Sequence, residues 1–271
     1  MAKTLHLSRS GYYAGRKRPI SRRKNENQVL ISRIKVVHQQ YRQIYGSPRI
    51  TAELLSQGFS CSRNRVARLM KENRIVAKTK RKFKVTTASR HKFPIAPNLL
   101  NQSFLASDRN QIWASDITYI HTREGWLYLA MVLDLHSRSV VGWSMGERLQ
   151  RDLVMDAFKQ AVIRRKPLPG LIFHSDRGVQ YACSDFRNLI KENNVIQSMS
   201  GKGNCYDNAV SESFFKTLKT ELVYFSRLKT RAEAKSEIFE YIEVFYNRQR
   251  RHSSLGYLSP AEFESKHLTL S

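Results

Sequence analysis

Three acidic residues stand where a carboxylate could do chemistry. Asp116 interrupts the otherwise apolar β pattern of residues 113–120, which contains no Lys or Arg to neutralise it. Asp176 follows an apolar run and precedes Arg177, so we expect it at the end of a buried strand, directed into a turn. Glu212 is expected on a helix. Because a buried carboxylate without a partner costs several kcal/mol, the pattern predicts a cation beside Asp116.

The helix that carries Glu212 is expected to begin at Asp207 and Asn208, which are favourable N-cap residues after a Gly-containing loop. Its apolar positions recur every four residues: Val210, Phe214, Leu218 and Leu222. Glu212 lies off this stripe and shares a face with Lys216 and Lys219, four and seven residues further on. We expect this polar face to look over the strand end that carries Asp176.

Three carboxylates suit hard divalent cations such as Mg²⁺, which prefer oxygen ligands and keep several waters. Other polar and aromatic residues have simpler interpretations. Asp134 is expected to end an apolar strand before a turn. Asp185 is expected in a first helical turn, and Asp207 is expected as an N-cap. His174 is expected to be an orienting hydrogen-bond partner. The three tryptophans are expected in the core, not as base-stacking platforms: Trp113, Trp126 and Trp143.

The sequence motifs around the three acids resemble those of a known family. These are Trp-Ala-Ser-Asp-Ile-Thr-Tyr at 113–119, His-Ser-Asp-Arg-Gly-Val-Gln-Tyr at 174–181 and Asp-Asn-Ala-Val-Ser-Glu-Ser-Phe-Phe at 207–215. Between the first and second acid lie 59 residues, and between the second and third lie 35. The chain is similar, over nearly its whole length, to the orfB-type transposases of two-reading-frame bacterial insertion sequences. These belong to the DDE transposase and retroviral-integrase superfamily.

The resemblance implies a DNA transposase that cleaves insertion-sequence ends and transfers them by 3′-hydroxyl attack on a phosphodiester. Asp116, Asp176 and Glu212 would be catalytic and would hold two Mg²⁺ ions, with Mn²⁺ as a substitute. Two ions stabilise both the attacking and the leaving oxygen of an in-line displacement. Asp116 would bridge both ions. Lys216 and Lys219 would run along the DNA end, as point charges on phosphate.

The fold implied is α/β: an RNase H-like mixed sheet with flanking helices, preceded by a small all-α helix-turn-helix domain. The strands are expected at 113–120, 126–134, 140–144, 171–174 and 195–198, the first three as an antiparallel meander. The helices are expected at 152–165, 184–193, from Asp207 through Glu212, and at 230–247, and a capping-box pattern at 259–262 opens a last short one.

Net charge is +25 in 271 residues, and its distribution is uneven. Residues 1–107 hold 24 Lys and Arg against 3 Asp and Glu, whereas residues 108–271 hold 23 against 19. The first part is therefore expected to bind a polyanion. Scattered, unpaired cysteines indicate a reducing compartment and no structural zinc. With no membrane-length apolar run and no signal sequence, we expect a soluble, cytoplasmic, nucleoid-associated protein.

Five segments are expected: a partial helical unit and basic linker (1–24), a helix-turn-helix domain (25–75), a basic linker along phosphate backbone (76–107), the catalytic core (108–225) and a C-terminal helical extension (226–271). The first helix of the helix-turn-helix domain is expected to have an apolar stripe of Leu30, Ile34, Val37 and Tyr41. Ser47-Pro48 is expected to cap the second helix, and Ser62 the reading helix. That helix carries the predicted DNA-binding residues Arg63, Arg65 and Arg68.

The expected partners are double-stranded DNA, both the terminal inverted repeats and the target, and further copies of the chain. Residues 1–24 look like a truncated beginning, so the upstream-frame orfA-type product is expected as a fusion or complex partner. Two other functions fit parts of the pattern: a catalytically silent DNA-binding regulator and an RNase H-like structure-specific nuclease. Intact acids argue against the first, and a helix-turn-helix argues against the second.

Overall fold

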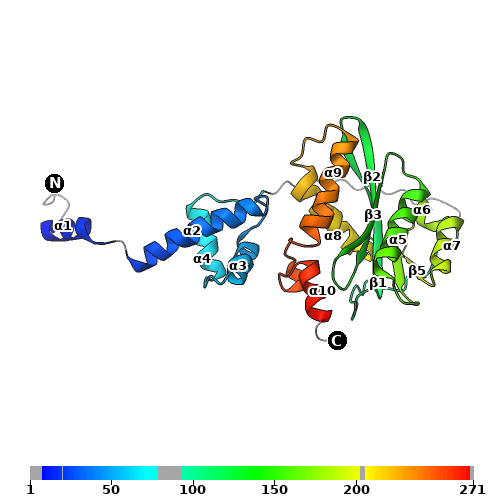
Figure 1. Ribbon diagram of the computed structural model, residues 1–271, viewed down its shortest axis with the longest axis horizontal. Coiled ribbons are helices and arrows are strands. Elements are labelled where there is room, and N and C mark those ends of the chain that lie inside the picture. Colours follow the sequence, from blue (N-terminus) through cyan, green and yellow to red (C-terminus); the bar gives the residue numbers. More distant parts are fainter. Residues whose placement is uncertain (1–7, 20, 79–92, 202–204, 269–271) are drawn as a thin grey trace. The chain divides into compact units, whose positions relative to one another are not determined.

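The computed structural model describes residues 8–19, 21–78, 93–201 and 205–268 (Figure 1). The chain divides into two compact units, residues 1–78 and 79–271. The basic cluster of the expected linker, Lys80, Arg81, Lys82 and Lys84, lies outside the described residues. No helix in the described ranges is both long enough and apolar enough to cross a membrane.

The first unit is all helical. Its elements are α1 (Arg9–Lys17), α2 (Arg22–Gln40), α3 (Ser47–Ser56) and α4 (Arg63–Glu72). Ser21 caps α2, because its Oγ accepts a 3.3 Å hydrogen bond from the Lys24 N–H. The helix therefore begins three residues before the boundary expected at Asn25. Its apolar stripe is as predicted, with Leu30, Ile34 and Val37 buried.

The two helices that follow pack on α2 and on each other. Their buried residues include Ile50, Leu54, Val66 and Leu69. Ser62 caps α4 through the Arg65 N–H, as predicted. The predicted cap of α3 is wrong: Gly46 is the N-cap and Ser47 already belongs to the helix, with Pro48 in its first turn. Gly58, with a φ of +83°, provides the left-handed residue of the turn between α3 and α4.

The second unit is built on a five-stranded mixed sheet. Its strands are β1 (Ile112–Thr122), β2 (Gly125–Asp134), β3 (Val140–Gly146), β4 (Ile172–Ser175) and β5 (Ile196–Met199), in the order β3-β2-β1-β4-β5. The first three form the predicted antiparallel meander, and β4 and β5 run parallel to β1. β4 is short and pairs with β1 only over Ile112–Ala114, so the rest of β1 extends beyond it.

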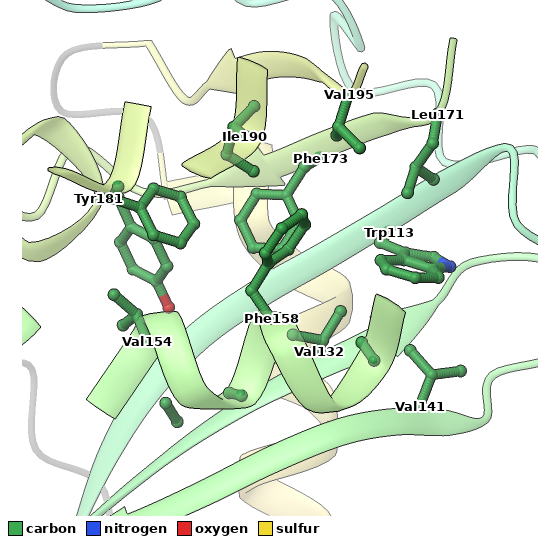
Figure 2. Close-up of a cluster of buried hydrophobic side chains, with 14 of the residues drawn as sticks. Trp113, Val132, Val141, Val154, Phe158, Leu171, Phe173, Tyr181, Ile190 and Val195 are labelled. Atoms are coloured by element: carbon green, nitrogen blue, oxygen red, sulfur yellow. The ribbon is translucent and has the colours of Figure 1, made fainter. Parts of the chain in front are cut away.

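One face of the sheet is covered by α5 (Arg151–Arg165) and α7 (Ser184–Glu192), over a dry aromatic core (Figure 2). Trp113, Phe158 and Phe173 are fully buried there. Gly142 of β3 lies beneath α5. A side chain at this position would collide with the Ala157 carbonyl oxygen, so glycine permits close approach of the helix. The short helix α6 (Val179–Ala182), not expected from the sequence, lies between β4 and α7.

The opposite face is covered by α8 (Ala209–Leu218) and α9 (Arg231–Glu240), which pack on β1 and β2 (Figure 1). Each helix continues into a π-helical turn, η2 (Lys219–Val223) and η3 (Tyr241–Tyr246). The last helix, α10 (Pro260–Leu268), has the predicted capping box. The Ser259 N–H donates to Glu262 Oε2 at 2.7 Å, and the Glu262 N–H donates to Ser259 Oγ at 3.2 Å.

The expected linker comprised residues 76–107, and its described second half, from residue 93 onward, packs against the rest of the catalytic unit. Leu100 is buried, the Leu99 N–H donates to Ser198 Oγ at 3.0 Å, and the Met199 N–H donates to the Pro97 carbonyl at 3.3 Å. These residues are therefore held by the catalytic unit, and do not form a free linker. An irregular segment without apolar periodicity gave no sign of these contacts.

Candidate active site

Asp116 lies on β1 past the last residue paired with β4. Because side chains alternate along a strand, Asp116 points away from the Trp113 core and toward the face covered by α8. Its Oδ1 accepts a 2.8 Å hydrogen bond from the Ile117 N–H. Part of its surface stays accessible. The short β4 thus exposes a carboxylate that a longer neighbouring strand would have covered.

Asp176 directly follows β4, as the sequence predicted. Its Oδ1 accepts a 2.9 Å hydrogen bond from the Gly178 N–H, which fixes the turn into α6. A Cβ at position 178 would lie 2.9 Å from the same oxygen, so the glycine leaves room for this carboxylate. Behind the acids, the Tyr181 hydroxyl lies 2.9 Å from Ser115 Oγ, which itself donates to the Met131 carbonyl at 2.7 Å. The sequence gave no reason to single out Tyr181.

Glu212 lies in the first turn of α8 and is the exposed member of the three. Burial raises its pKa above the ordinary value. In the described residues, no three His, Cys, Asp or Glu side chains are gathered tightly enough to form a metal-ligand set as they stand. Asp176 and Glu212 nevertheless act electrostatically on Asp116.

That interaction is strongest at Asp116. Burial raises the pKa of this carboxyl well above its usual range, and the negative charges of Asp176 and Glu212 raise it further. Lys219 acts in the opposite direction. The site therefore concentrates negative charge that the protein itself only partly compensates, which is the electrostatic condition for a cation site.

Lys219, predicted from the sequence to contact the DNA end, interacts electrostatically with Asp116. It stands at the junction of α8 and η2, and its Nζ lies 4.9 Å from the centroid of the Tyr119 ring. Burial lowers the pKa of Lys219, while the charge of Asp116 raises it. Lys216, predicted to share its role, is exposed on α8. The two lysines therefore differ in burial: Lys219 is partly buried against Tyr119, and Lys216 is exposed.

A polar network ties the loop before α8 to the sheet. His174 Nδ1 lies 2.8 Å from Ser198 Oγ, and its Nε2 lies 2.9 Å from the Asp207 carbonyl oxygen. This confirms the predicted orienting role of His174, and burial lowers its pKa. Asp207 Oδ2 accepts from Asn98 Nδ2 at 2.9 Å and from the Gly201 N–H at 2.6 Å.

These bonds correct the predicted start of the Glu212 helix. Asp207 is not the N-cap of α8; Asn208 is, without a side-chain capping bond, and the turn before it is a 3-10 helix, η1 (Cys205–Asn208). Of the predicted apolar stripe, Phe214, Leu218 and Leu222 are buried, whereas Val210 is partly exposed. The Asp207 side chain instead binds a segment more than a hundred positions earlier, which sequence spacing could not reveal.

The remaining expectations for acids and tryptophans are mixed. Asp134 is the buried last residue of β2, before a turn, as predicted, and it accepts from the Asn110, His136 and Ser137 N–H groups. Trp113 is in the core, as predicted. Trp143 is partly buried, and its Nε1 donates to Glu243 at 2.8 Å. The expectation for Trp126 is wrong, because 46% of this residue is exposed near the tip of the β1–β2 hairpin.

The three arginines of α4 are not equivalent. Arg65 is partly buried, with its Nε donating to Asn27 Oδ1 of α2 at 2.9 Å. Arg68 pairs with Glu72 along the helix at 3.1 Å. Arg63 is exposed at the N-terminal end of α4.

Comparison with known proteins finds family matches for both units of the chain. The integrase core domain family matches residues 106–205, and a second integrase core domain model matches residues 212–268. An HTH-like domain family matches residues 24–83. Transposase InsF for insertion sequence IS3A of Escherichia coli strain K12 is 44% identical over 270 residues, covering 99% of this chain and 94% of InsF. The chain belongs to the IS3 family of insertion-sequence transposases.

Another relative of the IS3-family chain is an uncharacterized 31 kDa protein of insertion element IS600 from Shigella sonnei. It is 48% identical over 267 residues, with 98% of each chain covered. The catalytic core of bovine immunodeficiency virus integrase is a solved structure with 20% identity, a TM-score of 0.43 and coverage of 60% of this chain and 99% of the viral core. The IS3-family chain is thus a DNA-binding DNA transposase of the DDE polynucleotidyl transferase class.

Proposed function

We propose that Asp116, Asp176 and Glu212 are the catalytic carboxylates of this transposase and hold two Mg²⁺ ions, with Mn²⁺ as a substitute. The observation that carries the proposal is the placement of the three acids: Asp116 lies on β1 past its pairing with β4, Asp176 directly follows β4, and Glu212 lies on α8, which packs on β1. The negative charges of Asp176 and Glu212 also raise the pKa of Asp116. A divalent cation would remove this repulsion. Carboxylate oxygens are the donors that such ions prefer. When bound, the ions would stabilise charge on the attacking and leaving oxygens of a phosphodiester.

The chain's own residues would prepare the site. The Gly178 N–H holds Asp176 in place, and the Ile117 N–H holds Asp116. Glu212 is exposed, so it is the carboxylate whose side chain we expect to move when metal and DNA bind. The reaction proposed is cleavage at the ends of an insertion sequence, followed by attack of the freed 3′-hydroxyl on target DNA.

The proposed DNA contacts come from both units. Arg63, Arg65 and Arg68 on α4 would read the terminal inverted repeats from the major groove. Lys216 and Lys219 would seat the DNA end beside the acids. We further propose that the chain acts as a homo-oligomer on DNA at the nucleoid in the cytoplasm, with an upstream-frame orfA-type product as its fusion or complex partner.

The triad is tested by replacing each acid separately: Asp116→Asn, Asp176→Asn and Glu212→Gln. Each variant should lose cleavage of a candidate element end in Mg²⁺ by about 10³-fold or more, since the ions contribute several kcal/mol of charge stabilisation. Binding of the same DNA should persist. Asp185→Asn, which changes an acid on α7, is the matched control and should cleave normally.

Three results would contradict the assignment. Near-normal cleavage by one of the triad variants would remove that residue from the site. Unmodified protein that binds ends but never cleaves them would favour the silent regulator. Cleavage of hybrids or junctions without any dependence on element ends would favour the structure-specific nuclease.

A further inference from the structure

The β1–β2 hairpin, whose first strand also carries Asp116, has an exposed aromatic cluster at its tip. β3 pairs with β2 only from Tyr128 onward, and β4 pairs with β1 only up to Ala114, so the hairpin tip extends past both neighbouring strands. On this tip His121 stands opposite Trp126 in the strand register. An indole exposed to 46% at such a position is not there to fill the core.

The cluster has a fixed shape. The Trp126 ring lies 5.1 Å from the Tyr119 ring at an interplanar angle of 89°, and 5.1 Å from the His121 ring at 79°. Its two neighbours therefore support it from the edges and hold its orientation. A rigid, partly exposed aromatic ring loses little conformational entropy when a flat ligand stacks on it.

The turn that carries the cluster is anchored to α9. Arg231 donates from its backbone N–H to Glu124 Oε2 at 2.8 Å and from Nε to the Trp126 carbonyl at 3.2 Å. The Arg123 N–H donates to the Leu228 carbonyl at 3.3 Å. Gly125, at a φ of +115°, permits the turn. The hairpin tip is thus attached to the body of the catalytic unit.

Lys219 connects the cluster to the acids. Its ammonium lies over the Tyr119 ring and also interacts electrostatically with Asp116. Arg123 adds an exposed cation at the turn. Cations interleaved with exposed aromatic rings are the surface that binds single-stranded nucleic acid, because every base offers a π-face and every nucleotide a phosphate. Inside a duplex those π-faces are covered by neighbouring bases.

We propose that Trp126, supported by Tyr119 and His121, stacks on an unpaired nucleobase of the DNA substrate at the tip of the β1–β2 hairpin. The inference rests on the proposed function for placing DNA there. It extends that function by assigning the hairpin tip to a displaced or single-stranded nucleotide and not to the duplex.

The test measures binding of the full chain, in EDTA to prevent chemistry, to a blunt duplex and to the same duplex with a short thymidine tail on either strand. Trp126→Ala should weaken binding of the preferred tailed duplex by about 5- to 150-fold and leave blunt-duplex binding unchanged. Trp126→Phe should retain most of the tail preference. Phe239→Ala is the matched control, because Phe239 is an aromatic residue of similar exposure, 49%, on α9.

Two further readouts separate stacking from charge. Abasic sites in the tail should abolish the preference of the unmodified protein. The tail should also quench tryptophan fluorescence, and Trp126→Phe should remove that quenching.

An unchanged tail preference in Trp126→Ala would overturn the proposal. A change in self-association by sedimentation, with tail preference intact, would also overturn it and would identify the hairpin as a contact between copies. Asp116→Asn separates the two proposals: we expect it to lose cleavage and keep the tail preference. If Asp116→Asn still cleaves, the proposed function fails but the measured tail preference still tests the stacking proposal. If the tail preference is unaffected by Trp126→Ala, the stacking proposal fails but the cleavage result still tests the proposed function.

Discussion

Each of the two compact units contains an arginine–glutamate pair, and the two pairs differ in burial. In the helix-turn-helix unit, the Arg68–Glu72 pair lies on the surface of α4, with 48% and 51% of the side chains exposed. In the catalytic unit, Arg250 and Glu221 form a buried pair with 5% and 9% exposed. Two guanidinium nitrogens of Arg250 donate to the two Glu221 oxygens at 2.7 Å, and the Tyr241 hydroxyl donates to Glu221 Oε2 at 2.8 Å.

The difference shows what basic residues contribute in each unit. Burial alone would lower the pKa of Arg250, but pairing with Glu221 raises it above the ordinary value, so this charge is committed to the fold. Glu221 belongs to η2, two residues after Lys219, so the pair also fixes the turn that places Lys219 beside Asp116. The surface arginines of α4 have weaker internal partners and remain accessible to DNA.

The largest expected effect comes from breaking the buried pair. Arg250→Ala or Glu221→Ala should destabilise the catalytic unit by about 3–5 kcal/mol, because each leaves an uncompensated buried charge. Arg68→Ala should cost at most about 1 kcal/mol, since exposed pairs contribute little. Urea unfolding of the full chain measures both. Equal losses in the free energy of unfolding would show that the buried and the exposed pair contribute equally to stability.

The next effect separates the two lysines of the Glu212 face. Lys219→Ala should reduce cleavage by about 100-fold, the lower end of what loss of one preorganised charge-stabilising group costs. Lys216→Ala, at an exposed position, should reduce it by less than about fivefold. Single-turnover cleavage, with footprinting of the terminal base pairs at matched salt, measures both. Similar losses would restore the equivalence that the sequence predicted.

A third effect separates the arginines of α4. Arg63→Ala should reduce the preference for element ends over random duplex by about 1–3 kcal/mol if it contacts base edges, or lower the salt slope by about one unit if it contacts phosphate. Arg65→Ala should also lower thermal stability, because Arg65 joins α4 to Asn27 of α2. Binding curves identical to those of the unmodified protein on both DNAs would exclude α4 from the interface.

The smallest expected effect concerns the metal-free active site. The raised pKa of Asp116 means that the folded chain binds this proton more tightly than the unfolded chain. The resulting stabilisation is fully present below the ordinary Asp pKa and is lost as pH rises through the raised value. At neutral pH in EDTA, Asp116→Asn should therefore raise the Tm by about 2–4 °C, or about 1 kcal/mol.

Two comparisons check the origin of that shift. The gain in Tm should disappear in acid, where Asp116 is protonated in both states. Mg²⁺ should stabilise the unmodified protein more than Asp116→Asn. An Asp116→Asn variant that is less stable than the unmodified protein at neutral pH would show that burial and the neighbouring negative charges do not destabilise the Asp116 carboxylate.

Local sequence patterns were enough to predict the family and most of the elements in their order. Apolar periodicity predicted the three-stranded meander, the helix between β3 and β4 and the burial of Leu30, Ile34 and Val37, because these patterns reflect local geometry and one-sided burial. The motif around Asp176 placed it correctly at a strand end. Such motifs are short and contiguous in the sequence, so they can be recognised without knowledge of the fold.

The tertiary structure decided which residues meet. Lys219 proved to interact electrostatically with Asp116, the side chain of Asp207 proved to hold Asn98 and Gly201, and Trp126 proved to be exposed. Each outcome depends on where one element ends relative to a neighbour distant in sequence: the short β4 uncovers Asp116, and the long β1–β2 hairpin carries Trp126 past β3. Periodicity records which face of an element is buried, but not how far the neighbouring element extends.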